Sequence, residues 1–167
     1  SSLATTKVKT ADELPAALEA VYAMAPQAMI EEFVKGREFS IGVYRTKGEL
    51  KALPVTEIIS SKEFFDYEAK YTPGVTSEVT PAAIEPLYAG LMAETAKKIY
   101  DVLNCKGICR VDFILEDDSK ELYFLEINTI PGQSENSIVP QQVRAMGMTL
   151  LAFYDSLIEE CLRSANA

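Results

Sequence analysis

The side chains best suited to chemistry lie on two short apolar segments, residues 107–115 and 122–128, which the acidic sequence EDDSKE joins. Both segments are rich in β-branched and aromatic residues and are predicted to be strands. In a strand, alternate side chains share a face. The faces of interest are then Ile108, Arg110, Asp112 and Ile114 on the first strand, and Leu122, Phe124, Glu126 and Asn128 on the second.

The pairing of these two strands decides whether their polar groups meet. If residue 114 pairs with residue 124, the polar side chains face each other in two pairs, Asp112 with Glu126 and Arg110 with Asn128. Two carboxylates directly opposite each other destabilise a sheet unless positive charge lies between them. A divalent cation held by oxygen supplies that charge, and the amide oxygen of Asn128 adds a neutral ligand.

Two interpretations of this polar face stay open. In the first, the acids bind Mg²⁺, Arg110 holds a phosphate or a developing oxyanion, and backbone N–H groups of the sequence TIPG at 129–132 face the same pocket. In the second, the face is simply solvated and Arg110 pairs with both acids. Four polar residues on one face of otherwise apolar strands, beside a Pro-Gly loop, favour the metal site.

Composition narrows the chemistry further. The chain of 167 residues contains no histidine, which excludes Ser-His hydrolysis, Cys-His proteolysis and histidine-based zinc sites within it. The formal net charge of −9 argues against nucleic-acid or anionic-membrane binding. Three cysteines without a CxxC spacing fit a reduced cytoplasm. No apolar run is long enough to cross a membrane. A magnesium site is therefore the favoured metal site.

The elements that position these groups follow from hydrophobic periodicity. Helical spacing predicts helices, and short apolar or alternating runs bounded by turn residues predict strands. The predicted helices are 11–23, 84–103 and 150–162, and the predicted strands are 28–34, 38–45, 50–59, 107–115 and 122–128. Residues 60–77 form a long polar and aromatic loop, and 129–140 a second irregular stretch. Strands with inserted helices indicate an α+β fold.

Several segments together are similar to one family. CRVDFIL, YFLEINTIPG and NSIVP resemble the C-terminal signature of the D-alanine–D-alanine ligases, which are members of the ATP-grasp superfamily. FFDYEAKY, IEEFVKGREF and the opening SSLATTKV resemble the same family, so the resemblance runs from Ser1 to the last helix. It implies an ATP-grasp C-terminal domain, mainly an antiparallel sheet with flanking helices, plus the tail of the central ATP-grasp domain.

The resemblance also implies a domain arrangement. Residues 1–36 correspond to the remainder of the central ATP-grasp subdomain and 37–167 to the C-terminal catalytic domain. On the same basis we expect the family's N-terminal domain, which supplies part of the D-alanine pocket, to be missing, together with two ATP-binding lysines of the early central domain. We therefore expect the chain to be a fragment with negligible ligase activity by itself.

Roles for individual residues follow from the same resemblance. Asp112, Glu126 and Asn128 match the ligands of two Mg²⁺ ions, for which Mn²⁺ could substitute. The catalytic positions are Arg110 and Gly132 at the oxyanion, Tyr71 closing over the substrates, and Ser1 orienting one of them. The ATP-binding positions are Lys70, the hinge residues Glu31, Glu32, Phe33 and Val34, and Glu38 at the ribose. Ser137 and Ile138 match the loop that holds the carboxylate of the second D-alanine.

The implied activity is the ATP-dependent ligation of two D-alanines through an acyl phosphate, for peptidoglycan synthesis in the cytoplasm. The implied partners are ATP, D-alanine and the missing N-terminal domain, with no nucleic acid and no membrane, and a homodimeric parent is left open. Two alternatives remain. One is another ATP-grasp carboxylate–amine ligase, or a D-alanine–D-lactate ligase. The other is a fragment that only binds nucleotide.

Overall fold

The computed structural model describes residues 5–60 and 76–165 of the chain. These residues divide between two compact units, one that contains residues 5–34, 60 and 76–77 and one that contains residues 35–59 and 78–165. The first unit contains a 3₁₀ turn, η1 (Ala11–Glu13), that leads directly into the helix α1 (Leu14–Tyr22). Pro15 stands in the first turn of α1, where its missing N–H costs nothing.

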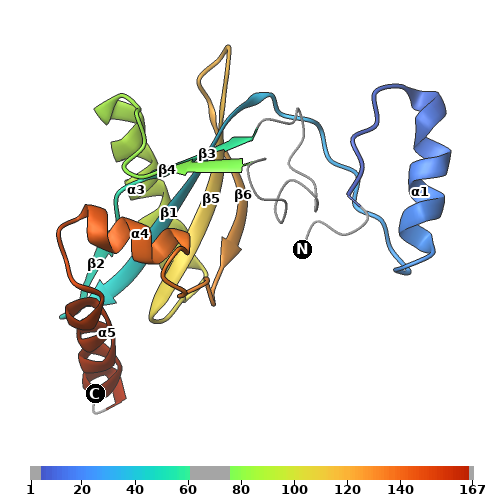
Figure 1. Cartoon of the computed structure of the whole chain (residues 1–167). Helices are drawn as coiled ribbons and strands as arrows, with labels where there is room; N and C mark the ends of the chain where they lie inside the picture. Colours follow the sequence, from blue (N-terminus) through green and yellow to red (C-terminus); the bar gives the residue numbers. More distant parts are fainter. Residues whose placement is uncertain (1–4, 61–75, 166–167) are drawn as a thin grey trace. The chain divides into compact units, whose positions relative to one another are not determined.

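The second unit is built on a six-stranded sheet in the order β4-β3-β1-β5-β6, with β2 also paired to β1. Each register that the structure gives is antiparallel. The strands are β1 (Gly36–Thr46), β2 (Glu49–Ala52), β3 (Thr56–Ser60), β4 (Thr76–Val79), β5 (Ile108–Glu116) and β6 (Leu122–Asn128). The helices are α3 (Pro86–Val102), α4 (Ile138–Ala145) and α5 (Leu150–Ala165). The predicted α+β fold, an antiparallel sheet with flanking helices, is confirmed (Figure 1).

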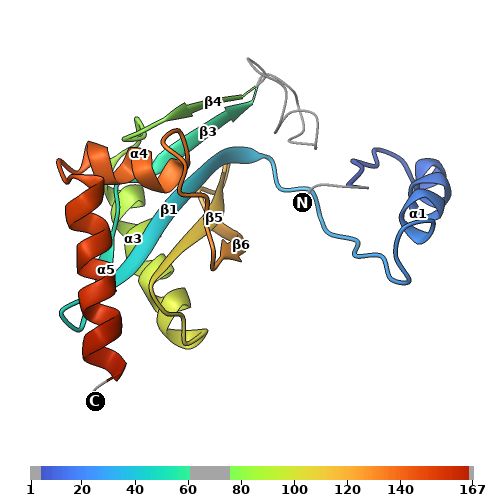
Figure 2. The same ribbon diagram turned by 60° about the horizontal axis from the view of Figure 1, so that its bottom comes forward.

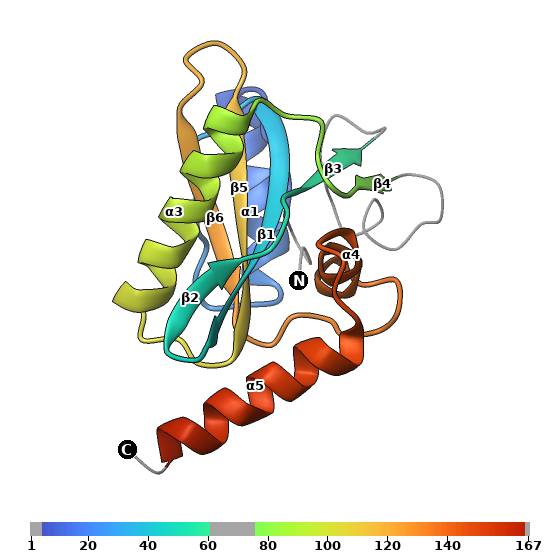
Figure 3. The ribbon, with the colours of Figure 1, turned by 90° about the vertical axis from the view of Figure 1, so that its left-hand side faces the viewer.

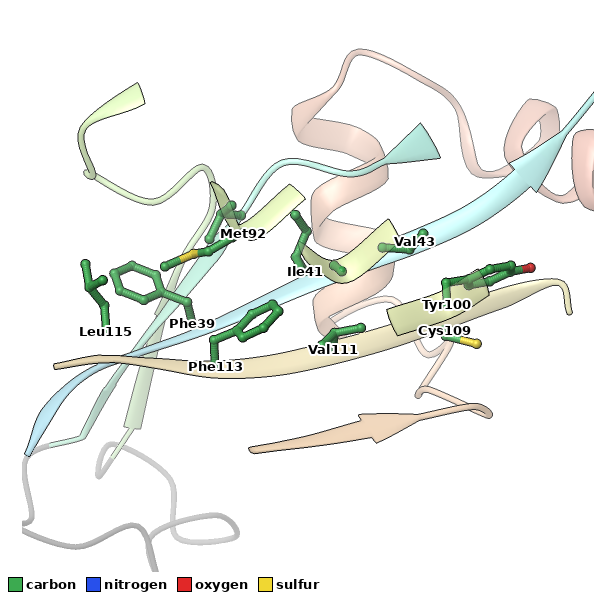
Figure 4. Packing of buried hydrophobic residues seen from close by; sticks show 11 residues of the cluster. Phe39, Ile41, Val43, Met92, Tyr100, Cys109, Val111, Phe113 and Leu115 are labelled. Carbon is green, nitrogen blue, oxygen red and sulfur yellow. The ribbon is translucent and has the colours of Figure 1, made fainter. Parts of the chain in front are cut away.

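One face of the sheet is closed by α3. Alternate residues of β1 and β5 point toward this helix, and Figure 4 shows their side chains meeting Met92 and Tyr100 of α3. The buried cluster consists of Phe39, Ile41, Val43, Val55, Met92, Ala96, Tyr100, Cys109, Val111, Phe113 and Leu115. Burying this much apolar surface is the main source of stability in the second unit.

The opposite face of the sheet is covered only in part, by α4 and α5. Figures 2 and 3 show these two helices together on the side of the sheet away from α3. Their apolar cluster consists of Tyr44, Leu53, Val139, Val143 and Phe153. The rings of Tyr44 and Phe153 meet edge-on with centroids 5.1 Å apart. Because Tyr44 pairs with Ile108, this cluster occupies one end of the β1–β5 pair.

Three predicted elements differ from the structure. Residues 28–34 form no strand, and most of them are exposed; an apolar run becomes a strand only where a neighbouring strand pairs with it. The predicted strand 50–59 is divided between β2 and β3 by a segment containing Pro54, which cannot donate to a sheet ladder. The helix α4 lies partly in a stretch predicted to be irregular, because eight residues are too few for a clear period.

Among the described helices, none combines the length and the apolar composition needed to cross a lipid bilayer.

The predicted turn at Lys47-Gly48 is present between β1 and β2. Both residues have positive φ, 51° and 80°, as a two-residue hairpin loop requires.

Candidate active site

The polar residues of β5 and β6 face each other in the predicted pairs. Asp112 pairs with Glu126 and Arg110 pairs with Asn128. Nearer the turn, the pairing differs from the prediction: Phe113 pairs with Phe124 and Ile114 with Tyr123. The predicted pairing of residue 114 with residue 124 is therefore wrong.

The reason is a β-bulge in β6. Asp112 of β5 pairs with Glu126, and the next residue of β5, Phe113, pairs with Phe124. Leu125 is therefore the additional residue of β6. A bulge shifts the alternation of side chains by one position. The prediction that Leu122 and Phe124 share a face with Glu126 is therefore wrong: both belong to the face covered by α3.

Contacts around Phe124 agree with this shift. Its ring meets that of the buried Phe113 at a centroid distance of 6.4 Å and an angle of 65°. The same side chain lines an apolar hollow of about 310 Å³ together with Ile99 and Val102 of α3. The bulge thus turns Leu122 and Phe124 toward α3, while Glu126 and Asn128 lie on the opposite face.

Asp112 is the centre of the polar face, and its side chain is only 8% exposed. The hydroxyl of Ser40 on β1 donates to its Oδ1 at 2.6 Å. Arg110 donates from Nε to Oδ1 at 2.9 Å and from its terminal nitrogen Nη2 to Oδ2 at 2.8 Å. A charged pair with little exposure survives only when such hydrogen bonds satisfy it. Both groups are thereby held in fixed orientations.

The charge of Arg110 is stabilised by its neighbours. Burial by itself lowers the pKa of the guanidinium, but the hydrogen bonds and negative charge of Asp112 outweigh this effect. The negative charges of Glu126 and of Glu78, on β4, raise the pKa of Arg110 further. The net result is a pKa above the ordinary value, so Arg110 is a permanent cation among three carboxylates.

β1 contributes the third strand of this face. Ser40 pairs with Asp112, Gly42 with Arg110 and Glu38 with Ile114. Cross-strand partners share a face, so the half-buried Glu38 lies on the same side of the sheet as Asp112, two residue pairs further along the strands.

The segment after β6 brings the remaining predicted residues of this unit together. Asn128 accepts a hydrogen bond from the N–H of Ile130 at 3.1 Å, which starts a tight turn. A Cβ on Gly132 would lie 2.8 Å from Oγ of Ser137, so the two positions adjoin and glycine permits the approach. Ser137 is the N-cap residue of α4, and Ile138 is the first residue of that helix.

A divalent cation is chemically compatible with this face. Asp112, Glu126 and Asn128 offer only oxygen donors, which hard cations such as Mg²⁺ prefer. Glu126 is exposed, whereas both oxygens of Asp112 already accept hydrogen bonds. Each carboxylate oxygen has two lone pairs. Oδ1 of Asp112 accepts from Ser40 and from Nε of Arg110, and Oδ2 accepts from Nη2 of Arg110 and, at 3.2 Å, from Nε, so a metal would take the place of one of these bonds. In the described ranges 5–60 and 76–165, no three His, Cys, Asp or Glu side chains gather closely enough to bind a metal by themselves.

The hinge residues of the predicted nucleotide site belong to the first unit. Glu31, Glu32 and Phe33 are exposed, and Val34 is half-buried. The ammonium group of Lys7 lies 3.5 Å from the centre of the Phe33 ring, in a cation–π contact. The other predicted residues outside the sheet, Ser1, Lys70 and Tyr71, lie outside the described residues.

Sequence reasoning missed three polar residues near Asp112. Ser40 could have been found, because it alternates with Glu38 on a predicted strand. Glu78 and Gln142 gave no such signal: the first lies in a short strand, β4, that starts at the end of the predicted loop 60–77, and the second on a helix that was not predicted.

The chain is similar to known proteins along nearly its whole length. The family described as the D-ala D-ala ligase C-terminus matches residues 1–159. A D-alanine–D-alanine ligase from Flavobacterium johnsoniae is 46% identical over 159 residues, which are 95% of this chain and 48% of that protein. A relative from Porphyromonas gingivalis strain W83, with the same name, is 42% identical over 99% of this chain and 50% of its own length.

Solved structures show the same similarity. The VanG D-Ala:D-Ser ligase from Enterococcus faecalis superposes with a TM-score of 0.84 and 35% identity, covering 95% of this chain and 46% of that one. The D-alanine–D-alanine ligase from Bacillus anthracis in complex with ATP gives a TM-score of 0.75 and 30% identity, over 94% of this chain and 50% of that one. The chain thus spans about half the length of these relatives.

Proposed function

The chain belongs to the family of D-alanine–D-alanine ligase C-terminal domains, and from this premise we propose that it forms the C-terminal catalytic half of an ATP-dependent ligase. The proposed reaction joins two D-alanines: the carboxylate of the first takes the γ-phosphoryl group of ATP, and the amine of the second then displaces phosphate. One observation carries the proposal, namely that Asp112 faces Glu126 and Arg110 faces Asn128 on a polar surface beside the start of α4.

Asp112, Glu126 and Asn128 are the proposed ligands of two Mg²⁺ ions. Bound Mg²⁺ would supply the positive charge that neutralises the triphosphate during phosphoryl transfer. The role of the chain is to hold oxygen donors on adjacent strands. Asp112 is fixed by Ser40 and Arg110, whereas Glu126 lies across from it on the exposed strand β6.

Arg110 and Gly132 are proposed to stabilise the oxyanion that forms when the amine attacks the acyl phosphate. Arg110 suits this role because its pKa is raised and its guanidinium is held by Asp112. A backbone N–H at Gly132 would add a second donor. Ser137 and Ile138 are proposed to bind the carboxylate of the second D-alanine, since the first N–H groups of a helix attract anions.

The nucleotide and lid residues are proposed from the resemblance. Glu31, Glu32, Phe33 and Val34 would recognise adenine, and Glu38 the ribose. Lys70 would contact the γ-phosphate, Tyr71 would close over the substrates, and Ser1 would orient one of them. Closure is needed because water hydrolyses an acyl phosphate. The domain limits at residues 36 and 37 and a cytoplasmic location are proposed on the same ground.

A hybrid protein tests this function directly. The first half of the Flavobacterium johnsoniae relative would be joined to this chain, replacing the matching second half. We expect phosphate release and dipeptide formation that depend on both ATP and D-alanine. The isolated chain is the matched control, and we expect negligible turnover from it. A hybrid that folds but forms no dipeptide would contradict the proposal.

The choice of acceptor is a second question, which the similarity to a D-Ala:D-Ser ligase raises. The same hybrid would be supplied with D-alanine, D-serine or D-lactate as the second substrate. We propose that D-alanine is preferred, since Tyr71 in the sequence EAKY matches the dipeptide-forming members of the family. A higher kcat/KM with D-serine or D-lactate would reassign the acceptor while leaving the ligase chemistry intact.

A further inference from the structure

Gln142 is a fully buried polar residue on α4 that the proposed mechanism does not use. Its side-chain amide lies at the interface between the helix and the sheet and makes three hydrogen bonds. It accepts from the N–H of Gly42 at 2.9 Å, and it donates to the carbonyl of Ser40 at 2.9 Å and to the hydroxyl of Thr56 at 3.0 Å. A buried amide is tolerated only when it is satisfied in this way.

These bonds are made where one edge of β1 changes partner. β3 pairs with β1 as far as Ser40, and β2 pairs with it from Val43 onward. Between these two stretches, the amide of Gln142 offers one donor and one acceptor to the backbone of β1, as a residue of a neighbouring strand would. Gly42 permits this approach, since a Cβ there would lie 2.6 Å from Cδ1 of Leu53 and 3.0 Å from Oε1 of Gln142. The side chain of Gln142 thus fixes the position of β1.

Ser40 connects this bridge to the site. Its carbonyl accepts from Gln142, and its hydroxyl donates to Oδ1 of Asp112 at 2.6 Å. Asp112 in turn holds Arg110 through two guanidinium nitrogens. Ser40 is 3% exposed, so solvent offers its hydroxyl no comparable alternative partner.

The same helix carries the proposed acceptor site at its N-terminus. Ser137 is the N-cap of α4, five positions before Gln142 in the sequence. One short helix therefore joins the group proposed to hold the acceptor carboxylate to the strand that orients Asp112. A carboxylate that accepts a hydrogen bond from a group outside the metal site binds metal better, because its orientation is already fixed.

We propose that Gln142 is a positioning residue: through Ser40 it sets the orientation of the Asp112 carboxylate, and it keeps that carboxylate in register with the start of α4. The part of this inference that concerns metal binding rests on the proposed function. The part that concerns the orientation of Asp112 and Arg110 does not.

The test uses NMR spectroscopy of the chain with Gln142→Met, which keeps the volume and removes the hydrogen bonds. We expect faster hydrogen exchange of the Gly42 amide and a shifted or exchange-broadened Arg110 Nε–H signal without any metal. We further expect Mn²⁺, followed by paramagnetic broadening around Asp112, to bind about tenfold more weakly. Gln141→Met is the matched control, because Gln141 bonds Glu78 and the carbonyl of Asn136 instead. It should leave the Gly42 amide unchanged.

A double-mutant cycle with Ser40→Ala separates positioning from general stability. If Gln142 acts through Ser40, the double variant binds Mn²⁺ no more weakly than the weaker-binding single variant. Additive losses, or a Gln142→Met variant with lower thermal stability but unchanged Arg110 and Mn²⁺ signals, would overturn the inference. If Gln142→Met does not fold, Thr56→Val removes one partner of Gln142 and is subject to the same criteria.

The two proposals fail in distinguishable ways. A wild-type chain whose Mn²⁺ broadening does not centre on Asp112 and Glu126 contradicts the metal assignment. The Arg110 and Gly42 signals of Gln142→Met would then still decide whether Gln142 positions Asp112.

Discussion

The two faces of the sheet are made from alternate residues of the same strands, but they are used differently. The residues of β1 and β5 that point toward α3 are apolar and buried; they include Phe39 on β1 and Leu115 on β5. On the opposite face, Tyr44 and Ile108 pack against α5 at one end, whereas Asp112 and Arg110 form a charged pair further along the strands. The first face supplies stability, which allows the second to carry charged groups that contribute little to it.

The two faces should respond differently to substitution. A substitution on the α3 face should lower the free energy of unfolding, whereas replacing an exposed charged residue of the polar face should lower binding or turnover with little effect on unfolding. The following predictions test this difference, in order of decreasing expected effect.

The largest effect is expected from Phe113→Ala, which leaves a cavity beneath α3. We expect a loss of about 3–5 kcal/mol in the free energy of unfolding, measured by urea denaturation and circular dichroism. Ile114→Ala is the matched control, since Ile114 is the next residue of β5, points to the opposite face and is only half-buried. Equal losses for both variants would remove the distinction between the faces.

The second effect is expected from Glu126→Gln. In the hybrid enzyme described above, we expect turnover to fall by about 100-fold, because the proposed metal site loses a charged ligand. The free energy of unfolding should change by no more than about 0.5 kcal/mol, since Glu126 is exposed. Turnover close to that of the unmodified hybrid would refute the metal assignment.

The third effect is expected from Gly42→Ala, where β1 meets Gln142. The added methyl group would lie 2.6 Å from Cδ1 of Leu53. We therefore expect the free energy of unfolding, measured by thermal denaturation, to fall by about 1–3 kcal/mol. Gly90→Ala, within α3, is the control, because a Cβ there meets nothing within 4 Å. It should stabilise the chain by about 0.5–1 kcal/mol through helix propensity. Destabilisation by both changes would show that the effect is not specific to β1.

The smallest effect is expected in the pH dependence of stability, through Glu160 on α5, the helix that covers the apolar end of the second face. Glu160 on α5 accepts hydrogen bonds from Arg163 and from the N–H of Gly48, which lower its pKa to about 2. A lowered pKa in the folded state means that the ionised form stabilises the fold. This contribution is complete above the ordinary carboxyl pKa of 4.5 and is lost as the pH falls toward 2.

The measurement is the melting temperature between pH 6 and pH 2 for the wild type and for Glu160→Gln. Because the glutamine does not titrate, we expect the melting temperatures of the two proteins to converge as the pH falls through this range. A difference that stays constant from pH 6 to pH 2 would refute a role for the ionised Glu160.

The sequence by itself determined which polar residues meet on β5 and β6 and the kind of chemistry they can perform. Alternating apolar residues identified β1 and β5, and apolar residues at helical spacing identified α3, because burial imposes those periods on a strand and on a helix. The same pattern placed Asp112 opposite Glu126 and Arg110 opposite Asn128. Such information is local, since it depends on the strand period and on the turn that joins two neighbouring strands.

Only the tertiary structure decided the features that depend on residues distant in the sequence. The bulge at Leu125 reverses the faces of Leu122 and Phe124, because packing against α3 outweighs strict alternation. Residues 28–34 have the composition of a strand but form none, because pairing and not composition makes a strand. The bond from Gln142 to the carbonyl of Ser40 spans 102 positions, and no local pattern encodes it. Long-range hydrogen bonds of this kind exist only once the chain has packed.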